Sequence, residues 1–305
     1  MLPVYREKDT LVHGLHPLAA LALVASVAAA ALVLENPLYT AVVCVGALAL
    51  LARAEALADG KAILRAAAVM GLLVAFINPL VNNAGEHVLV YGPSIPLWGK
   101  LDITAEALLY GLAAGARLFT VVAAFCLFAL AVNPDDLLEL MSRLSFRSSL
   151  AAALAVRLYP SMVVEAVEMR DAQLARGDPL SGGGRLNRAK AYLPLLLSLF
   201  QGALDRAASI AESMSARGFG SRGRTRRKVG IFRPRDILAA LVSSGIAAAV
   251  VLQSLRGGGY DFFPVLADPL AETDLPALGL LCFSLVSFLF VCGSWKKWHW
   301  WRSRI

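Results

Sequence analysis

Six apolar runs divide the chain, and short polar segments separate most of them. They lie near 17–34, 37–53, 62–83, 104–132, 236–254 and 275–293. A helix needs ~20 predominantly apolar residues to cross the hydrocarbon core of a bilayer. Pro37 separates the first two runs, because proline removes a backbone donor and ends a helix. The pattern therefore predicts an all-α polytopic membrane protein with about six transmembrane helices.

The segment between the fourth and fifth runs has a different pattern. It begins with a short amphipathic helix, for which Asn133 or Asp135 would be the N-terminal cap. Two long helical segments follow, and we expect an internal proline, Pro160 or Pro194, to interrupt each of them. Polar side chains recur in both at three- or four-residue spacing, which predicts one polar stripe on an apolar helix. The stripe residues are Glu165, Glu168 and Asp171 in the first segment and Gln201, Asp205, Ser209 and Glu212 in the second.

These patterns predict three regions. Residues 1–132 would hold four transmembrane helices, residues 133–235 would form long amphipathic helices outside the membrane, and residues 236–305 would hold the last two spans and a basic tail. The glycine run between the two long segments and their two prolines are typical of elements that change angle. A proline in a membrane-associated helix is also a common packing feature. The glycines of the run are Gly182, Gly183 and Gly184.

Composition and charge support a lipid environment for much of the chain. Of its 305 residues, 58% are hydrophobic and 17% are charged, whereas soluble domains have about 45–50% apolar and about 25% charged residues. Seventeen of the 29 lysines and arginines lie between positions 143 and 235, while the segments 84–103 and 255–274 hold one each. Because Lys and Arg concentrate in cytoplasmic loops, we expect a multi-pass plasma-membrane protein with both termini and residues 133–235 in the cytoplasm. The basic run 221–228 directly precedes an apolar run, which favours contact with anionic lipid over nucleic acid.

The patterns for catalysis or metal binding are weak. Asp135, Asp136 and Glu139 could hold magnesium and a diphosphate, but acidic residues at a helix start are also favoured by the helix dipole. The four cysteines lie inside apolar runs, and the chain has no Gly-x-x-x-x-Gly-Lys-Ser/Thr motif. We therefore expect no catalytic residue and no metal or cofactor bound directly. The alternative is an integral-membrane enzyme acting on lipid or diphosphate substrates. A stand-alone transporter is disfavoured, because no repeat relates the two halves.

The fourth apolar run carries two further candidates. Glu106 and Arg117 are eleven residues apart, close to three helical turns, so both face the same side of a helix. Charges inside a span are functional candidates, and a structural pair or a contact with a neighbouring helix is an equally good interpretation. Gly111 and Gly115 form a Gly-x-x-x-Gly motif, which allows close helix contact and fits a surface for a partner protein.

The tripeptide Ala-Arg-Gly occurs at 175–177 and again at 216–218, at the ends of the two long amphipathic segments. Glycine tolerates the left-handed backbone of a helix C-terminal cap, and an arginine in the last turn meets the negative end of the helix dipole. Two well-capped helix ends are one interpretation. The other is docking, because an exposed guanidinium suits bidentate pairing with a carboxylate of another protein. Two copies then indicate two docking points for two similar partners.

These motifs, in this order, resemble the transmembrane T component of energy-coupling factor (ECF) transporters, the EcfT/CbiQ family. The resemblance covers most of the chain, although residues 236–305 match no motif of the family. Its stretches are "HPLAAL" at 16–21, "NPL" at 36–38, "ITAEALLYGLAAGARL" at 103–118, "NPDDLLELM" at 133–141, "RLYPSMVVEAVEMRDAQLARG" at 157–177 and "RAASIAESMSARGFG" at 206–220.

The resemblance implies a non-catalytic coupling subunit of an ATP-driven importer. In that family, each motif arginine inserts into a groove on one of two cytoplasmic ABC ATPase subunits. ATP-driven motion then passes to a membrane-embedded, substrate-binding S component, which releases a vitamin or a transition-metal ion. Carried over, Arg176 and Arg217 would contact the ATPases, ATP would be bound by those partners, and the substrate stays open among cobalt, nickel, biotin and other vitamins. Four small residues would let the helix tips approach closely, namely Ala175, Gly177, Ala216 and Gly218.

Overall fold

The structure is a computed structural model of the chain. It describes residues 8–81, 87–90, 94–95, 99–100, 103–141, 145–177, 185–221, 233–256, 260, 262 and 274–294. The chain divides into two compact units. Unit 1 comprises Met1–Leu137 and Gly230–Ile305, and unit 2 comprises Leu138–Val229. The glycine run 182–184 and most of the basic run, residues 222–228, lie outside the described residues.

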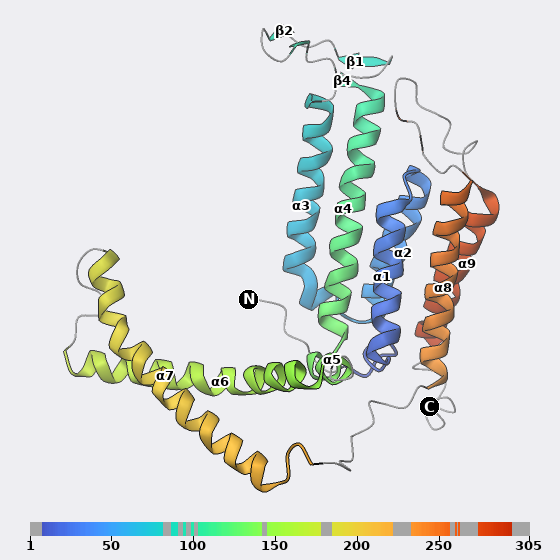
Figure 1. The fold of residues 1–305 in the computed structure, drawn as a ribbon. Coiled ribbons are helices and arrows are strands. Elements are labelled where there is room, and N and C mark those ends of the chain that lie inside the picture. The colour runs from blue at the N-terminus through green and yellow to red at the C-terminus, as the bar shows by residue number, and fades with distance from the viewer. Residues whose placement is uncertain are drawn as a thin grey trace. The chain divides into compact units, whose positions relative to one another are not determined.

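Unit 1 contains a bundle of six long helices, one at each predicted apolar run (Figure 1). They are α1 (Pro17–Val33), α2 (Pro37–Arg53), α3 (Leu57–Val81), α4 (Ala105–Ala131), α8 (Pro234–Leu255) and α9 (Leu275–Ser294). By length and composition α3, α4, α8 and α9 can cross a membrane, whereas α1 and α2 are apolar but have only 17 residues each. The predicted all-α polytopic membrane fold is confirmed.

Between α3 and α4 the chain forms two short antiparallel strand pairs. β1 (Val88–Val90) pairs with β4 (Ile103–Thr104), and β2 (Ser94–Ile95) pairs with β3 (Gly99–Lys100). The pairing of β1 with β4 joins the segment after α3 to the residues that directly precede α4.

Prolines and polar caps set the starts of α1 and α2. Pro17 and Pro37 lie in the first helical turns, where a missing N–H leaves no hydrogen bond unmade. His16 Nδ1 accepts a hydrogen bond from the backbone N–H two residues later at 3.2 Å, and Asn36 Oδ1 does the same at 2.9 Å. The predicted helix break at Pro37 is therefore a tight, capped turn.

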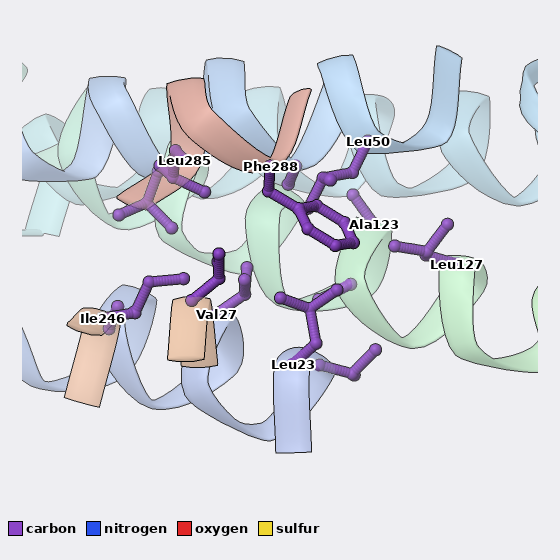
Figure 2. Close-up of a cluster of buried hydrophobic side chains, with 14 of the residues drawn as sticks. Leu23, Val27, Leu50, Ala123, Leu127, Ile246, Leu285 and Phe288 are labelled. Atoms are coloured by element: carbon purple, nitrogen blue, oxygen red, sulfur yellow. The ribbon is translucent and has the colours of Figure 1, made fainter. Parts of the chain in front are cut away.

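Five helices contribute to one apolar core in unit 1. α4 packs against α1, α2 and α3, α8 packs against α1, and α9 packs against α8 and α2. Figure 2 shows side chains of these helices meeting in the core. The labelled residues are Leu23, Val27, Leu50, Ala123, Leu127, Ile246, Leu285 and Phe288. The last two helices, for which the sequence offered no motif, thus complete the packing around α1 and α2.

Glycines bring α3 and α4 into close contact. A Cβ on Gly71 would lie 2.9 Å from the carbonyl oxygen of Gly115, and a Cβ on Gly111 would lie 2.8 Å from the carbonyl oxygen of Ala75. Such distances leave no room for a side chain. The prediction that Gly111 and Gly115 face a partner protein is therefore wrong, because α3 of the same chain occupies that face. Helix association in lipid depends on this kind of close van der Waals packing.

Asp236 joins the start of α8 to the start of α1. Its side chain is 1% exposed. Oδ1 accepts a hydrogen bond from the backbone N–H of His16 at 2.7 Å, and Oδ2 accepts one from the backbone N–H of Arg233 at 2.8 Å. One carboxylate therefore satisfies backbone donors at two helix N-termini that are 220 positions apart in sequence.

We expect Asp236→Ala to lower the thermal stability of the chain clearly. The change removes the acceptor for two backbone N–H groups, and a buried donor left without a partner costs about 1–3 kcal/mol. Melting temperatures from fluorescence-detected size-exclusion chromatography in mild detergent measure the effect. Ser244→Ala is the control, because this residue of α8 is exposed and its hydroxyl donates, among the described residues, only to the carbonyl of Leu241. An unchanged melting temperature for Asp236→Ala would contradict the assigned role.

Unit 2 consists mainly of two long helices that pack against each other, α6 (Phe146–Ala175) and α7 (Arg185–Ala216). Before them lies α5 (Pro134–Met141), where Asn133 Oδ1 accepts a hydrogen bond from Asp135 N at 3.0 Å. Of the two residues predicted as candidates for this cap, Asn133 is therefore the one that caps the helix. The prediction that Pro160 and Pro194 interrupt their helices is wrong, since both helices continue through them. Each proline removes one backbone hydrogen bond from its helix, and both proline side chains are exposed.

Candidate functional site

The first Ala-Arg-Gly ends α6. Arg176 is the C-cap, and its backbone N–H donates to the carbonyls of Ala172 and Gln173 at 3.2 and 3.1 Å. Gly177 follows with a φ of +82°, and its N–H donates to the carbonyl of Leu174 at 3.0 Å. The predicted left-handed glycine cap is confirmed at this helix end.

The second Ala-Arg-Gly ends α7 in the same way. Gly218 has a φ of +72°, and its N–H donates to the carbonyl of Ser215 at 2.9 Å. The N–H of Phe219 donates to the carbonyl of Met214 at 3.0 Å, which completes a Schellman motif. Arg217 therefore occupies the same position at the end of α7 as Arg176 occupies at the end of α6.

Backbone conformation, and not lack of space, requires glycine at both tips. Among the described residues, no atom lies within 4 Å of a Cβ built on Gly177, and a Cβ on Gly218 meets only Ser221 Oγ at 3.5 Å. A side chain in the left-handed region costs about 1–2 kcal/mol. Ala175 and Ala216, the last helical residues, are exposed. The residues on either side of each tip arginine are therefore all small.

The guanidinium groups of Arg176 and Arg217 are exposed, and neither makes a hydrogen bond or ion pair with another described residue. Other arginines of the same helices are paired. Arg170 lies 3.0 Å from Asp171, and Arg206 lies 2.6 Å from Glu165. A guanidinium fixed at a capped helix end presents its planar fork of donors outward. Such a group can bind a carboxylate through two parallel hydrogen bonds.

Large apolar side chains lie exposed on the same two helices. Eight of them are more than half exposed, and they are Val156, Tyr159 and Val164 on α6 and Leu193, Leu196, Leu197, Phe200 and Leu204 on α7. Contiguous apolar surface of this kind marks contact with protein or membrane. The segment Arg147–Ala175 is also long and apolar enough to span a membrane by composition, although none of its apolar window is buried in the structure.

The polar stripe predicted on α6 is only partly solvent-facing. Glu168 and Asp171 are exposed, as expected, but Glu165 is half-buried and forms the ion pair with Arg206 of α7. The sequence periodicity could not reveal this pair, because it joins two helices. The signal that could have found it is a shared spacing, since both residues lie eleven positions before their terminal arginines.

The two charged residues of α4 bind different partners. Glu106 is 1% exposed, and its Oε1 accepts a hydrogen bond from His87 N at 3.2 Å and lies 2.8 Å from His87 Nδ1. Arg117 donates to the carbonyl oxygen of Leu34, the C-cap of α1, at 3.4 Å. Arg117 therefore contacts a neighbouring helix, whereas Glu106 contacts the segment just before β1, and the two do not pair with each other. A cation at the C-terminal end of α1 also complements the helix dipole.

The described residues offer little for metal or redox chemistry. Among them, no group of three or more His, Cys, Asp or Glu could hold a metal ion. Asp135 and Asp136 lie in the first turn of α5, where acidic side chains favour the helix dipole. All four cysteines are free thiols. The two arginine tips are therefore the most distinctive chemical feature of the described residues.

Comparison with known proteins shows similarity to one family of transport proteins. A family model described as a cobalt transport protein, CbiQ, matches residues 8–228, a range that includes both tips. The chain is 28% identical over 198 residues to the energy-coupling factor transporter transmembrane protein EcfT of Bacillus selenitireducens, covering 61% of this chain and 72% of that protein. Proteins of the same name from Exiguobacterium sibiricum and Acidaminococcus fermentans are 31% and 28% identical over 172 and 204 residues. These two alignments cover 53% and 62% of this chain and 65% and 75% of the relatives.

Proposed function

The chain belongs to the CbiQ family of cobalt transport proteins, and we propose that it is the transmembrane coupling subunit of an ECF-type ABC importer. It docks two ATPase subunits through Arg176 and Arg217 and passes their ATP-driven motion to a membrane-embedded S component. The S component binds the substrate, a vitamin or a transition-metal ion. The observation that carries this proposal is the pair of exposed guanidinium groups, without a partner among the described residues, on two helix ends that are each capped by a left-handed glycine.

The geometry of the tips supports docking over capping alone. A helix end needs only the glycine and its backbone hydrogen bonds, which both tips have. An arginine that served the helix dipole alone would give less than about 1 kcal/mol at an exposed site. Two equivalent tips fit two equivalent carboxylate-containing grooves, and the small residues Ala175, Gly177, Ala216 and Gly218 keep bulk away from each guanidinium.

The charge distribution supports a plasma-membrane location with both termini and unit 2 in the cytoplasm. Six spans place the basic segment 143–235 inside and the segments 84–103 and 255–274, each with a single basic residue, outside. If α6 crossed the membrane as a seventh span, the basic run 222–228 would lie outside the cell and the segment 257–273 would lie inside. That arrangement contradicts the preference of Lys and Arg for the cytoplasmic side. The exposed apolar residues of α6 and α7 then serve contact with partners or with the cytoplasmic membrane surface.

The chain itself has no catalytic role in this proposal. ATP is bound and hydrolysed by the partner subunits, and this subunit binds no cofactor and no nucleic acid. Purification from native membranes in mild detergent tests the proposal. Two ATPase chains and a further membrane protein should co-purify with each tagged copy. If the chain is isolated alone and hydrolyses a lipid or diphosphate substrate, the membrane-enzyme alternative is correct instead.

A further inference from the structure

We propose that the ion pair between Glu165 and Arg206 is the pivot of a pseudo-two-fold joint between α6 and α7, and that it sets the separation of the two arginine tips. Both are positioning residues, since neither belongs to the tips. The inference rests on the proposed function, because it concerns how two docking points are held for two partner subunits. It is carried by three observations on unit 2, namely the burial pattern, the ion pair and the arm lengths.

The two helices have the same burial pattern when residues are counted back from their terminal arginines. Buried or half-buried positions occur 3, 7, 11, 14, 18 and 22 residues before Arg176 and also before Arg217. Within these stretches only Ala166 and Gly202 break the correspondence. The matched pairs are Leu154 and Leu195, Leu158 and Leu199, Met162 and Ala203, Glu165 and Arg206, Met169 and Ile210, and Gln173 and Met214. Each pair differs by 41 positions, as the tripeptides do, so α6 and α7 carry equivalent stripes of buried or half-buried residues.

The charge pair stands in the middle of this shared face. Arg206 Nη1 lies 2.6 Å from Glu165 Oε2, with the two side chains 34% and 27% exposed. A Cβ on Gly202, one turn before Arg206, would lie 3.3 Å from Glu165 Oε1. The helices therefore come close at this point, and Figure 1 shows that α6 and α7 cross. Apart from Gln173, the other matched positions are apolar and can slide or rotate, whereas a charged pair fixes register.

The helices extend equally far beyond the pair. Eleven residues separate Glu165 from Arg176, and eleven separate Arg206 from Arg217. At 1.5 Å per residue each arm is about 16 Å long, and eleven residues come within about 20° of three full turns. Pivot and tip therefore face nearly the same side of each helix. Two equal arms about one pivot suit a pair of like subunits related by a two-fold axis.

The separation of the tips can be measured on the full chain in lipid nanodiscs. Ala172 and Ser213 are exposed, lie 41 positions apart and precede each tip arginine by four residues. Spin labels on Ala172→Cys and Ser213→Cys, in a chain whose four native cysteines are replaced by alanine, report the distance by double electron–electron resonance. We expect Glu165→Gln to broaden and shift the distance distribution and to lower ATP-driven uptake several-fold. Glu165→Arg combined with Arg206→Glu restores the pair with exchanged charges and should recover both readouts.

Glu168→Gln is the matched control, because Glu168 is exposed, lies one turn further along α6 and has no partner among the described residues. The proposal is overturned if Glu165→Gln leaves the distance distribution unchanged, if Glu168→Gln broadens it equally, or if the exchanged pair fails to restore it. The distance measurement needs no ATPase. The docking proposal fails if the chain still retains the ATPases after Arg176 and Arg217 are replaced. The pivot proposal fails on the distance distribution, so the two failures are distinguishable.

Discussion

Arg176→Ala combined with Arg217→Ala should abolish retention of the ATPase subunits and ATP-driven uptake, while the chain still folds and inserts. Both side chains are exposed and make no contact with other described residues that folding would lose. In the proposed complex each guanidinium is buried against a carboxylate. Removing one partner of such a pair costs about 2–5 kcal/mol, which lowers affinity by a factor of about 30 or more at each tip. Each single variant should therefore retain weak binding, and the double variant none.

Pull-down of the ATPases with tagged chain, followed by uptake in proteoliposomes, measures this effect. Arg170→Ala is the matched control, because Arg170 is exposed on α6 and, within the described part of the chain, pairs only with its neighbour Asp171. Lysine at both tips should restore binding only partly, since an ammonium group lacks the planar fork. Full ATPase-driven uptake by the double alanine variant would show that the tips are capped helix ends and nothing more.

Gly115→Leu should prevent correct assembly of unit 1. The Cα of Gly115 faces the carbonyl of Gly71, and a Cβ at either position would be closer to the other helix than real side chains come. Overpacking a tight contact usually costs about 1–3 kcal/mol, and here the obstacle is backbone that has no rotamer to change. α3 and α4 must then separate along their contact. We expect a large loss of monodisperse protein and a lower melting temperature in detergent.

Gly279→Leu provides the control for the general effect of leucine at a helical glycine. Gly279 lies in α9, and no atom lies within 4 Å of a Cβ built there. Its replacement should be tolerated. A stable, monodisperse Gly115→Leu chain would contradict the α3–α4 contact and would return Gly111 and Gly115 to the status of a candidate partner surface.

Some elements were predictable because their signals are local. The six apolar runs predicted the helices of unit 1, Pro37 predicted the helix break that Asn36 caps, and the two glycines after Arg176 and Arg217 predicted left-handed caps. Each of these depends on a few neighbouring residues, such as a proline ring, a cap side chain or a missing Cβ. The two tips were identified as a candidate site for the same reason.

The errors concern the interior and the faces of helices. Pro160 and Pro194 lie inside α6 and α7 without ending them, because a proline removes one backbone hydrogen bond and leaves the others of a long helix in place. Gly111 and Gly115 contact α3 and not another protein, because a small-residue motif indicates close approach without identifying the partner. Glu106 and Arg117 face one side of α4, yet His87 and Leu34 bind them separately.

By itself, the sequence determined that this protein is a helical membrane protein with two capped, arginine-bearing helix ends. These properties follow from hydropathy and from backbone preferences that act within one or two turns. Only the tertiary structure decided that Asp236 joins α8 to α1, that α8 and α9 complete the core, and that Glu165 meets Arg206 between the two arms. Each of these contacts joins residues tens to hundreds of positions apart, and helical periodicity within one segment carries no information about which distant segment will cover its face.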